Sequence, residues 1–142
     1  MTFFKREAES VDWLRGVDFF DGFTDDELQR VLALSSELEA SSGTILIDQG
    51  DAGAECFVVV AGAVAVYIGG DYVTSVSAGS MVGETALIEH RPRNASVVVT
   101  SDAKLLRFDA VQFRRLLEEM PKASERVMTM LQRRLSGAPP QS

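Results

Sequence analysis

Three patterns of apolar residues follow one another along the chain: helical, strand-like and then helical again. Residues 12–20 form a short segment that is apolar on one side and that Gly22 ends. Thr24 precedes Glu27 by three residues, and apolar positions follow at helical spacing, so a capping box opens an amphipathic helix that fades near residues 40–43. The first quarter is therefore predicted to be helical.

From residue 44 onward, short runs rich in Val, Ile and aromatic residues alternate with glycine-containing turns. Such short strands at regular spacing favour an antiparallel sandwich or barrel over a fold of alternating strands and helices. The predicted strands cover residues 44–48, 56–60, 63–68, 72–76, 96–100 and 104–108.

Helical spacing returns near the end of the chain. Asp109 can cap a helix that continues to Met120, and Pro121 ends or bends it. Residues 122–135 carry a second apolar stripe, which predicts a second C-terminal helix.

These elements form one predicted domain over residues 1–142, with a core of 11–135 and a flexible tail at 136–142. The predicted fold is mainly β with flanking helices: an antiparallel, jelly-roll-like β-roll with N-terminal helices, a short helix inside one loop and two C-terminal helices. No linker interrupts it.

Composition narrows the classes of function. With 142 residues, 46% hydrophobic and 25% charged, the chain can bury a core. The net charge of −7 argues against a nucleic-acid partner, and no apolar run is long enough for membrane insertion. Cys56 is alone, so a reducing cytoplasm is expected, and we interpret it as a small buried hydrophobe. No His/Cys/Asp cluster accompanies Asp51, so no metal site is predicted.

The charge is unevenly distributed, because residues 103–142 hold eight basic and four acidic side chains. Two interpretations stay open. The excess is ordinary helix-surface charge, or it forms a basic face that meets an acidic partner or an anionic ligand.

The segment 79–96, GSMVGETALIEHRPRNAS, interrupts the strand pattern, and loops of this length in compact domains are usually functional. Residues 83–87 can form one helical turn whose free N–H groups suit an anion. Arg93 can return to the same place and add a guanidinium for a phosphate. Glu84 beside them suits a sugar hydroxyl, so the pattern predicts a ligand such as a nucleotide.

Residues 83–88 (GETALI) and 91–96 (RPRNAS) resemble the phosphate-binding cassette of cyclic nucleotide-binding domains. That family includes catabolite activator proteins, regulatory subunits of cAMP-dependent protein kinase and cyclic-nucleotide-gated channels. The glycine spacing at 43–62 and the segment 105–113 also match, so the resemblance covers about residues 11–135.

The resemblance implies that Glu84 binds the ribose 2′-hydroxyl, that Arg93 pairs with the cyclic phosphate and that Gly83 permits close approach. Backbone N–H groups near Ala86, Asn94 and Ala95 complete the cradle. The implied ligand-binding residues are Gly83, Glu84, Thr85, Ala86, Arg93, Asn94 and Ala95. The last helix is expected to cover the base as a lid, with Arg126, Met130 and Arg133 as candidate contacts.

The expected function is that of a stand-alone cyclic-nucleotide sensor that relays binding through its C-terminal helices to a protein partner or to self-association. Asn94 does not decide between adenine and guanine, and cAMP is favoured over cGMP on family prevalence. No cofactor beyond this ligand is expected. Nucleotide-hydrolase, esterase and metalloprotease motifs are absent, so we predict a binding protein and not an enzyme.

Two alternatives stay open. In one, Glu84 and Arg93 form a structural ion pair in a ligand-free β-roll that serves as an interaction scaffold. In the other, the pocket takes a different phosphorylated ligand. The stripe of Met128, Met130, Leu131 and Leu135 is interpreted as core packing or as a lid or partner-binding face.

Overall fold

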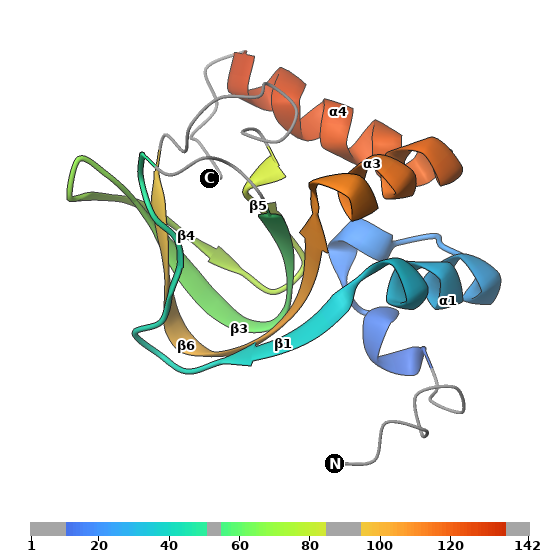
Figure 1. Cartoon of the computed structure of the whole chain (residues 1–142), viewed down its shortest axis with the longest axis horizontal. Coiled ribbons are helices and arrows are strands. Elements are labelled where there is room, and N and C mark those ends of the chain that lie inside the picture. Colours follow the sequence, from blue (N-terminus) through green and yellow to red (C-terminus); the bar gives the residue numbers. More distant parts are fainter. Residues whose placement is uncertain (1–10, 51–54, 85–94, 136–142) are drawn as a thin grey trace.

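The computed structural model describes residues 11–50, 55–84 and 95–135 (Figure 1). Its helical elements are η2 (Asp12–Leu14), η3 (Asp18–Phe20), α1 (Asp25–Leu34), α3 (Ala110–Glu119) and α4 (Pro121–Leu135). Its strands are β1 (Ser36–Ala40), β2 (Ile45–Ile47), β3 (Glu55–Ile68), β4 (Asp71–Ser77), β5 (Met81–Val82) and β6 (Ser96–Asp109).

The described strands form one curled antiparallel sheet in the order β1-β6-β3-β4, with β2 added to β6 and β5 added to β3. The long strands β3 and β6 pair with each other, and each also gives its two halves to different neighbours. In Figure 1 the helices lie together at one end of the curled sheet. The predicted antiparallel β-roll with flanking helices is confirmed.

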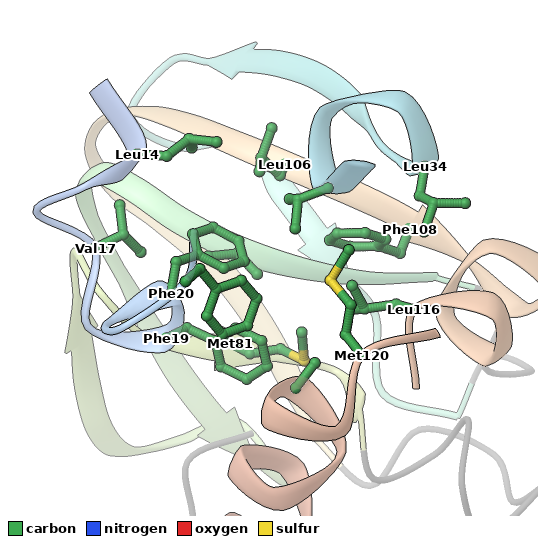
Figure 2. Close-up of a cluster of buried hydrophobic side chains, with 14 of the residues drawn as sticks. Leu14, Val17, Phe19, Phe20, Leu34, Met81, Leu106, Phe108, Leu116 and Met120 are labelled. Carbon is green, nitrogen blue, oxygen red and sulfur yellow. The ribbon is translucent and has the colours of Figure 1, made fainter. Parts of the chain in front are cut away.

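Each face of the sheet carries its own buried cluster, because side chains alternate along the strands. Cys56 and Val58 of β3 point to the helices, whereas Phe57 and Val59 point into the roll. We call the first set the helix-side cluster; Figure 2 shows Leu14, Phe20, Met81, Leu106, Phe108, Leu116 and Met120 within it. The interior cluster comprises Ile47, Phe57, Val59, Val64, Val66, Val76, Val82, Ala95, Val97, Val99, Ala103 and Leu105.

The predicted helix caps are confirmed. The Glu27 N–H donates to Thr24 Oγ1 (3.2 Å), and the Thr24 N–H donates to Glu27 Oε1 (2.7 Å), which completes the capping box of α1. Asp109 caps α3 by accepting from the N–H of Gln112 (2.8 Å). Pro121 stands at the first position of α4, where its missing N–H costs no helical hydrogen bond.

The predicted single helix over residues 12–20 is wrong, because the structure has two short 3-10 helices there, η2 and η3. Val17 adopts an extended backbone (φ −88°, ψ 120°) and separates them. Gly22 does end the segment, with a φ of +82° that glycine adopts without strain.

The predicted fading of the first long helix near residue 40 is also wrong, because α1 ends at Leu34 and β1 follows. Ser35 is extended, and Leu38 and Ala40 of β1 then pack against the interior cluster. The alternation of these two apolar residues with Glu37 and Glu39 has the period of a strand.

Two pairs of predicted strands are in fact single long strands, since 56–60 joins 63–68 in β3 and 96–100 joins 104–108 in β6. Gly62 makes this possible with a φ of +87° at a point where the β3–β6 register shifts. A Cβ at Gly62 would stand 2.4 Å from the Asp102 carbonyl oxygen, so the two backbones approach too closely for a side chain.

Candidate functional site

The two-residue strand β5 leads directly into the predicted cassette. Val82 of β5 pairs with Phe57 and belongs to the interior cluster, while Met81 faces the helix-side cluster. Gly83 follows with a φ of +90°, which turns the chain out of the sheet. Glu84 comes next, and its side chain has no exposed surface.

Glu84 is the buried charged side chain among the residues that the structure describes. Burying a charge costs several kcal/mol unless hydrogen-bond donors surround it. The oxygen atoms of a buried carboxylate therefore need donors, from the protein or from a ligand. An ionised carboxylate accepts about four hydrogen bonds, enough for protein donors and a ligand hydroxyl together. A carboxylate can in this way accept from a sugar hydroxyl, the role that the sequence predicts for Glu84.

The far end of the predicted cassette returns to the same face of the sheet. Ala95 is 3% exposed and packs in the interior cluster together with Val82, just before β6 begins. Ser96 fastens this return, because its Oγ accepts from the N–H of Gln49 (2.9 Å). Val82, directly before the cassette, and Ala95, near its end, thus both belong to the interior cluster. Thr85, Ala86, Arg93 and Asn94 lie outside the described residues.

Arg107 and Glu55 bring a pair of charged side chains to the interior wall. Arg107 of β6 donates through Nη1 to Glu55 Oε2 of β3 (2.9 Å), and both side chains are about half-buried. Neither residue is among the ligand-binding residues predicted from the sequence. The signal was available, since Arg107 follows the interior residue Leu105 by two positions in a strand.

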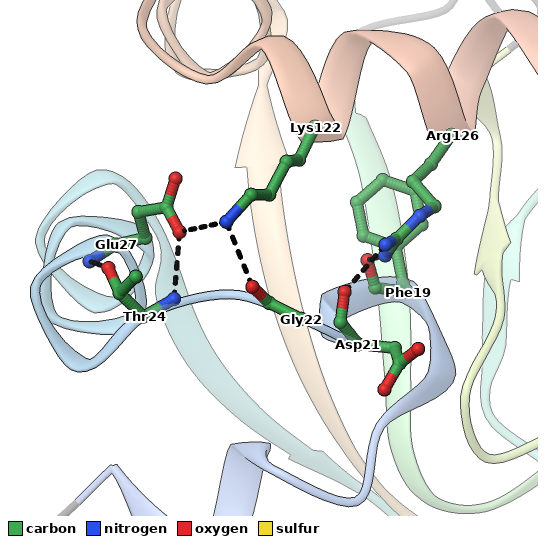
Figure 3. Close-up of polar contacts among 7 residues, drawn as sticks. All are labelled: Phe19, Asp21, Gly22, Thr24, Glu27, Lys122 and Arg126. Atoms are coloured by element: carbon green, nitrogen blue, oxygen red, sulfur yellow. Dashed lines mark hydrogen bonds and ion pairs between the residues drawn. The ribbon is translucent and has the colours of Figure 1, made fainter.

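Of the lid candidates on α4, Arg126 points toward the N-terminal turns in this structure (Figure 3). Arg126 donates to the carbonyl oxygens of Phe19 (2.6 Å) and Asp21 (2.5 Å). Met130 packs against the helix-side cluster, and Arg133 is exposed. None of the three lies in either described end of the cassette.

Lys122 joins Arg126 in fastening α4 to the N-terminal segment. Its Nζ donates to the Gly22 carbonyl oxygen and to Glu27 Oε1, both at 2.8 Å. The hydrogen bond from Lys122 to Glu27, and after it the one from the Thr24 N–H, hold the pKa of Glu27 below its ordinary value. We call the contacts of Lys122 and Arg126 with residues 19–27 the α4 clamp.

The structure also gives the burial of Cys56 and Met128, two residues interpreted from the sequence. Cys56 has no exposed surface, as predicted for a small buried hydrophobe. Met128 is 51% exposed, so of the two interpretations of its stripe, core packing does not apply to this residue. Within residues 11–50, 55–84 and 95–135 no helix is long and apolar enough to cross a membrane. Asp51 lies outside the described residues.

Comparison with known proteins decides the family. The sequence matches the family model of the cyclic nucleotide-binding domain over residues 37–120, which is more than half of the chain. The chain belongs to the cyclic nucleotide-binding domain family. The matched region contains β5, Glu84, Ala95 and the ion pair between Glu55 and Arg107.

Two curated relatives of this cyclic nucleotide-binding domain show the extent of the similarity. It is 37% identical over 109 residues to the Pycsar effector protein XpPycTIR of Xanthomonas perforans, covering 76% of this chain and 36% of that protein. It is 34% identical to the cAMP-dependent protein kinase regulatory subunit of Blastocladiella emersonii, covering 76% of this chain and 28% of that protein. The chain thus spans only about a third of the length of these relatives.

Solved structures share the fold. The catabolite activator protein of Thermus thermophilus aligns with a TM-score of 0.76 at 25% identity, covering 84% of this chain and 59% of that one. The cAMP complex of the regulatory domain of Toxoplasma gondii protein kinase A aligns with a TM-score of 0.73 at 26% identity, covering 94% of this chain and 51% of that one.

Proposed function

We propose that this domain binds a cyclic nucleotide, cAMP in preference to cGMP, on the interior wall of the β-roll, and that binding is relayed through α3 and α4 to a partner protein or to self-association. The observation that carries the proposal is the fully buried Glu84 carboxylate, which directly follows a glycine with positive φ at the end of β5.

The carboxylate of Glu84 suits the ribose of a cyclic nucleotide. It would accept a hydrogen bond from the 2′-hydroxyl, and hydrogen bonds to charged groups contribute about 1.5–3 kcal/mol. Because Glu84 has no exposed surface, a ligand that reaches it must change the packing around it. Binding and conformational change are therefore coupled at this residue.

The remaining contacts of the proposal rest on the motif. Arg93 would pair with the cyclic phosphate, with Gly83, Thr85, Ala86, Asn94 and Ala95 forming the cradle around it. Preference for cAMP is supported by the relatives, since the regulatory subunits of Blastocladiella emersonii and Yarrowia lipolytica are both described as cAMP-dependent. We also expect this domain to bind the nucleotide without converting it.

A relay from this site to the helices would start at β5. Val82 touches the interior cluster, while its neighbour Met81 has no exposed surface and packs in the helix-side cluster with Met120 and Val127. A change in packing at Glu84 therefore reaches α3 and α4 through two adjacent residues. Closely packed cores transmit such shifts because they cannot absorb them in empty space.

The α4 clamp would be the element that responds. It fixes α4 to residues 19–27 through charge-assisted hydrogen bonds, which a shift of the helix must lengthen or break. A ligand changes this equilibrium only by its difference in affinity for the two arrangements. Hydrogen exchange at residues 17–23, with and without cAMP, would report the response.

The test of the binding proposal is a calorimetric titration of the protein with cAMP and with cGMP, with Arg93→Glu as the paired variant. We expect saturable binding, tighter for cAMP, that the charge reversal abolishes because it places a carboxylate against the phosphate. Arg114→Glu, at an exposed position of α3, is the matched charge reversal and distinguishes loss of the phosphate contact from a general change in charge.

Absence of binding to either nucleotide, by a protein with an intact cooperative melt, would contradict the proposal and favour the scaffold alternative. The regulatory subunit of a cAMP-independent protein kinase A from Trypanosoma brucei aligns with a TM-score of 0.76 at 21% identity, so the fold alone does not imply dependence on cAMP. Competition with linear nucleotides would identify the remaining alternative, a different phosphorylated ligand.

A further inference from the structure

Arg107 lies in the row of the sheet that leads to Glu84. The strand registers pair Arg107 with Phe57 and Phe57 with Val82, so one line crosses β6, β3 and β5. Phe57 and Val82 are both interior residues, and Leu105, two positions before Arg107, is interior as well. Arg107 therefore extends from the interior wall, beside the strand from which the cassette begins.

One buried donor of Arg107 has no hydrogen-bond partner. Its Nη1 donates to Glu55 Oε2 at 2.9 Å, whereas its Nε–H is buried and has no hydrogen-bond partner. A buried donor without a partner destabilises the fold, and such groups in folded proteins call for a specific explanation. A ligand acceptor that meets this N–H would supply one.

The side chains of Arg107 and Glu55 are too exposed for an ion pair inside a hydrophobic core, and a ligand can reach them. The side chain of Arg107 is 43% exposed and that of Glu55 is 37% exposed. The guanidinium is thus both anchored by a carboxylate and reachable, an arrangement that fixes its orientation without neutralising all its donors. A planar guanidinium held in this way suits the oxygen atoms of a phosphate or sugar.

We propose that Arg107 is a further ligand-binding residue, oriented by Glu55, and that it donates to the sugar–phosphate end of the cyclic nucleotide. Its place in the row of Val82 selects this end of the ligand, since Gly83 and Glu84 follow Val82 directly. The inference rests on the proposed function. It adds a second cation to the site and gives Glu55 the role of a positioning residue.

The test measures affinity for cAMP and cGMP in the wild type, Arg107→Lys and Arg107→Gln. Lysine keeps a charge for Glu55 but lacks the planar fork of donors, so we expect both variants to bind at least about tenfold more weakly. The two nucleotides differ only in the base, so the loss is expected to be equal for both. Thermal melts of each variant establish that it is folded.

The control is Arg30→Gln, because Arg30 makes an ion pair with Glu119 between α1 and α3 at almost the same exposure, 42% and 38%. It is expected to keep wild-type affinity. Wild-type affinity in both Arg107 variants would overturn the inference and leave the proposed function intact. A loss confined to one nucleotide would place Arg107 at the base and overturn it as well. A wild type that binds neither nucleotide would overturn both proposals.

Discussion

Glu55 and Arg107 bring charge to a wall that is otherwise built from valine and other apolar side chains, and the buried Glu84 follows that wall directly at the end of β5. Glu84 was recognisable from the sequence because a glycine precedes it within an interrupted strand pattern. Its complete burial was not, since burial depends on which residues fold over it. Arg107 was missed because a charged residue in a strand is read as a solvent-facing position, whereas here its period places it beside Leu105 on the interior wall.

Gly62 gives the sharpest prediction for stability at the scale of a single residue. Gly62→Ala must place a Cβ within 2.4 Å of a backbone oxygen at a φ of +87°, so we expect unfolding to become easier by about 1–3 kcal/mol. Chemical denaturation measures the change. Gly16→Ala is the control, because a Cβ there meets nothing within 4 Å. Equal losses in the two variants would contradict the account of the β3–β6 approach.

At the scale of elements, the features that the sequence predicted correctly are those that depend on residues close together in the chain. The caps of α1 and α3 and the break at Pro121 were predictable, because each depends on residues three or four positions apart. β1 and the continuity of β3 and β6 were not, because they depend on pairing with strands distant in the sequence, such as Leu38 with Leu105. β5 has only two residues and carries no periodic signal of its own.

The α4 clamp predicts a pH dependence at this scale. Its hydrogen bonds lower the pKa of Glu27 in the folded protein, so Glu27 stabilises the fold above its ordinary pKa of 4.5 and loses this contribution as the pH falls through the lowered value. The difference in unfolding free energy between wild type and Glu27→Gln should therefore shrink below about pH 4.5. Denaturation between pH 3 and pH 7 measures it.

Lys122→Gln removes the principal donor to Glu27 and is expected to reproduce that behaviour, since the pKa of Glu27 then returns toward its ordinary value. A difference between wild type and Glu27→Gln that stays constant from pH 7 to pH 3 would contradict the clamp as a stabilising contact.

At the scale of the whole molecule, one curled sheet separates two buried clusters that meet at β5. The interior cluster forms the wall of the proposed site, and the helix-side cluster joins α3 and α4 to the N-terminal turns (Figures 1 and 2). The family resemblance predicted this architecture. It did not predict the orientation of Arg126 toward η3, because a lid residue is defined by contacts that change with the position of the helix.

The central claim is that Glu84 receives the sugar of a cyclic nucleotide on the interior wall, and ligand pairs test it most directly. Wild type and Glu84→Gln would each be titrated with cAMP and with 2′-deoxy-cAMP. We predict that wild type binds cAMP at least about tenfold more tightly than the deoxy analogue, because only cAMP donates to the carboxylate. Glu84→Gln should lose most of this discrimination. Equal binding of both ligands by wild type, or full discrimination by Glu84→Gln, would contradict the account.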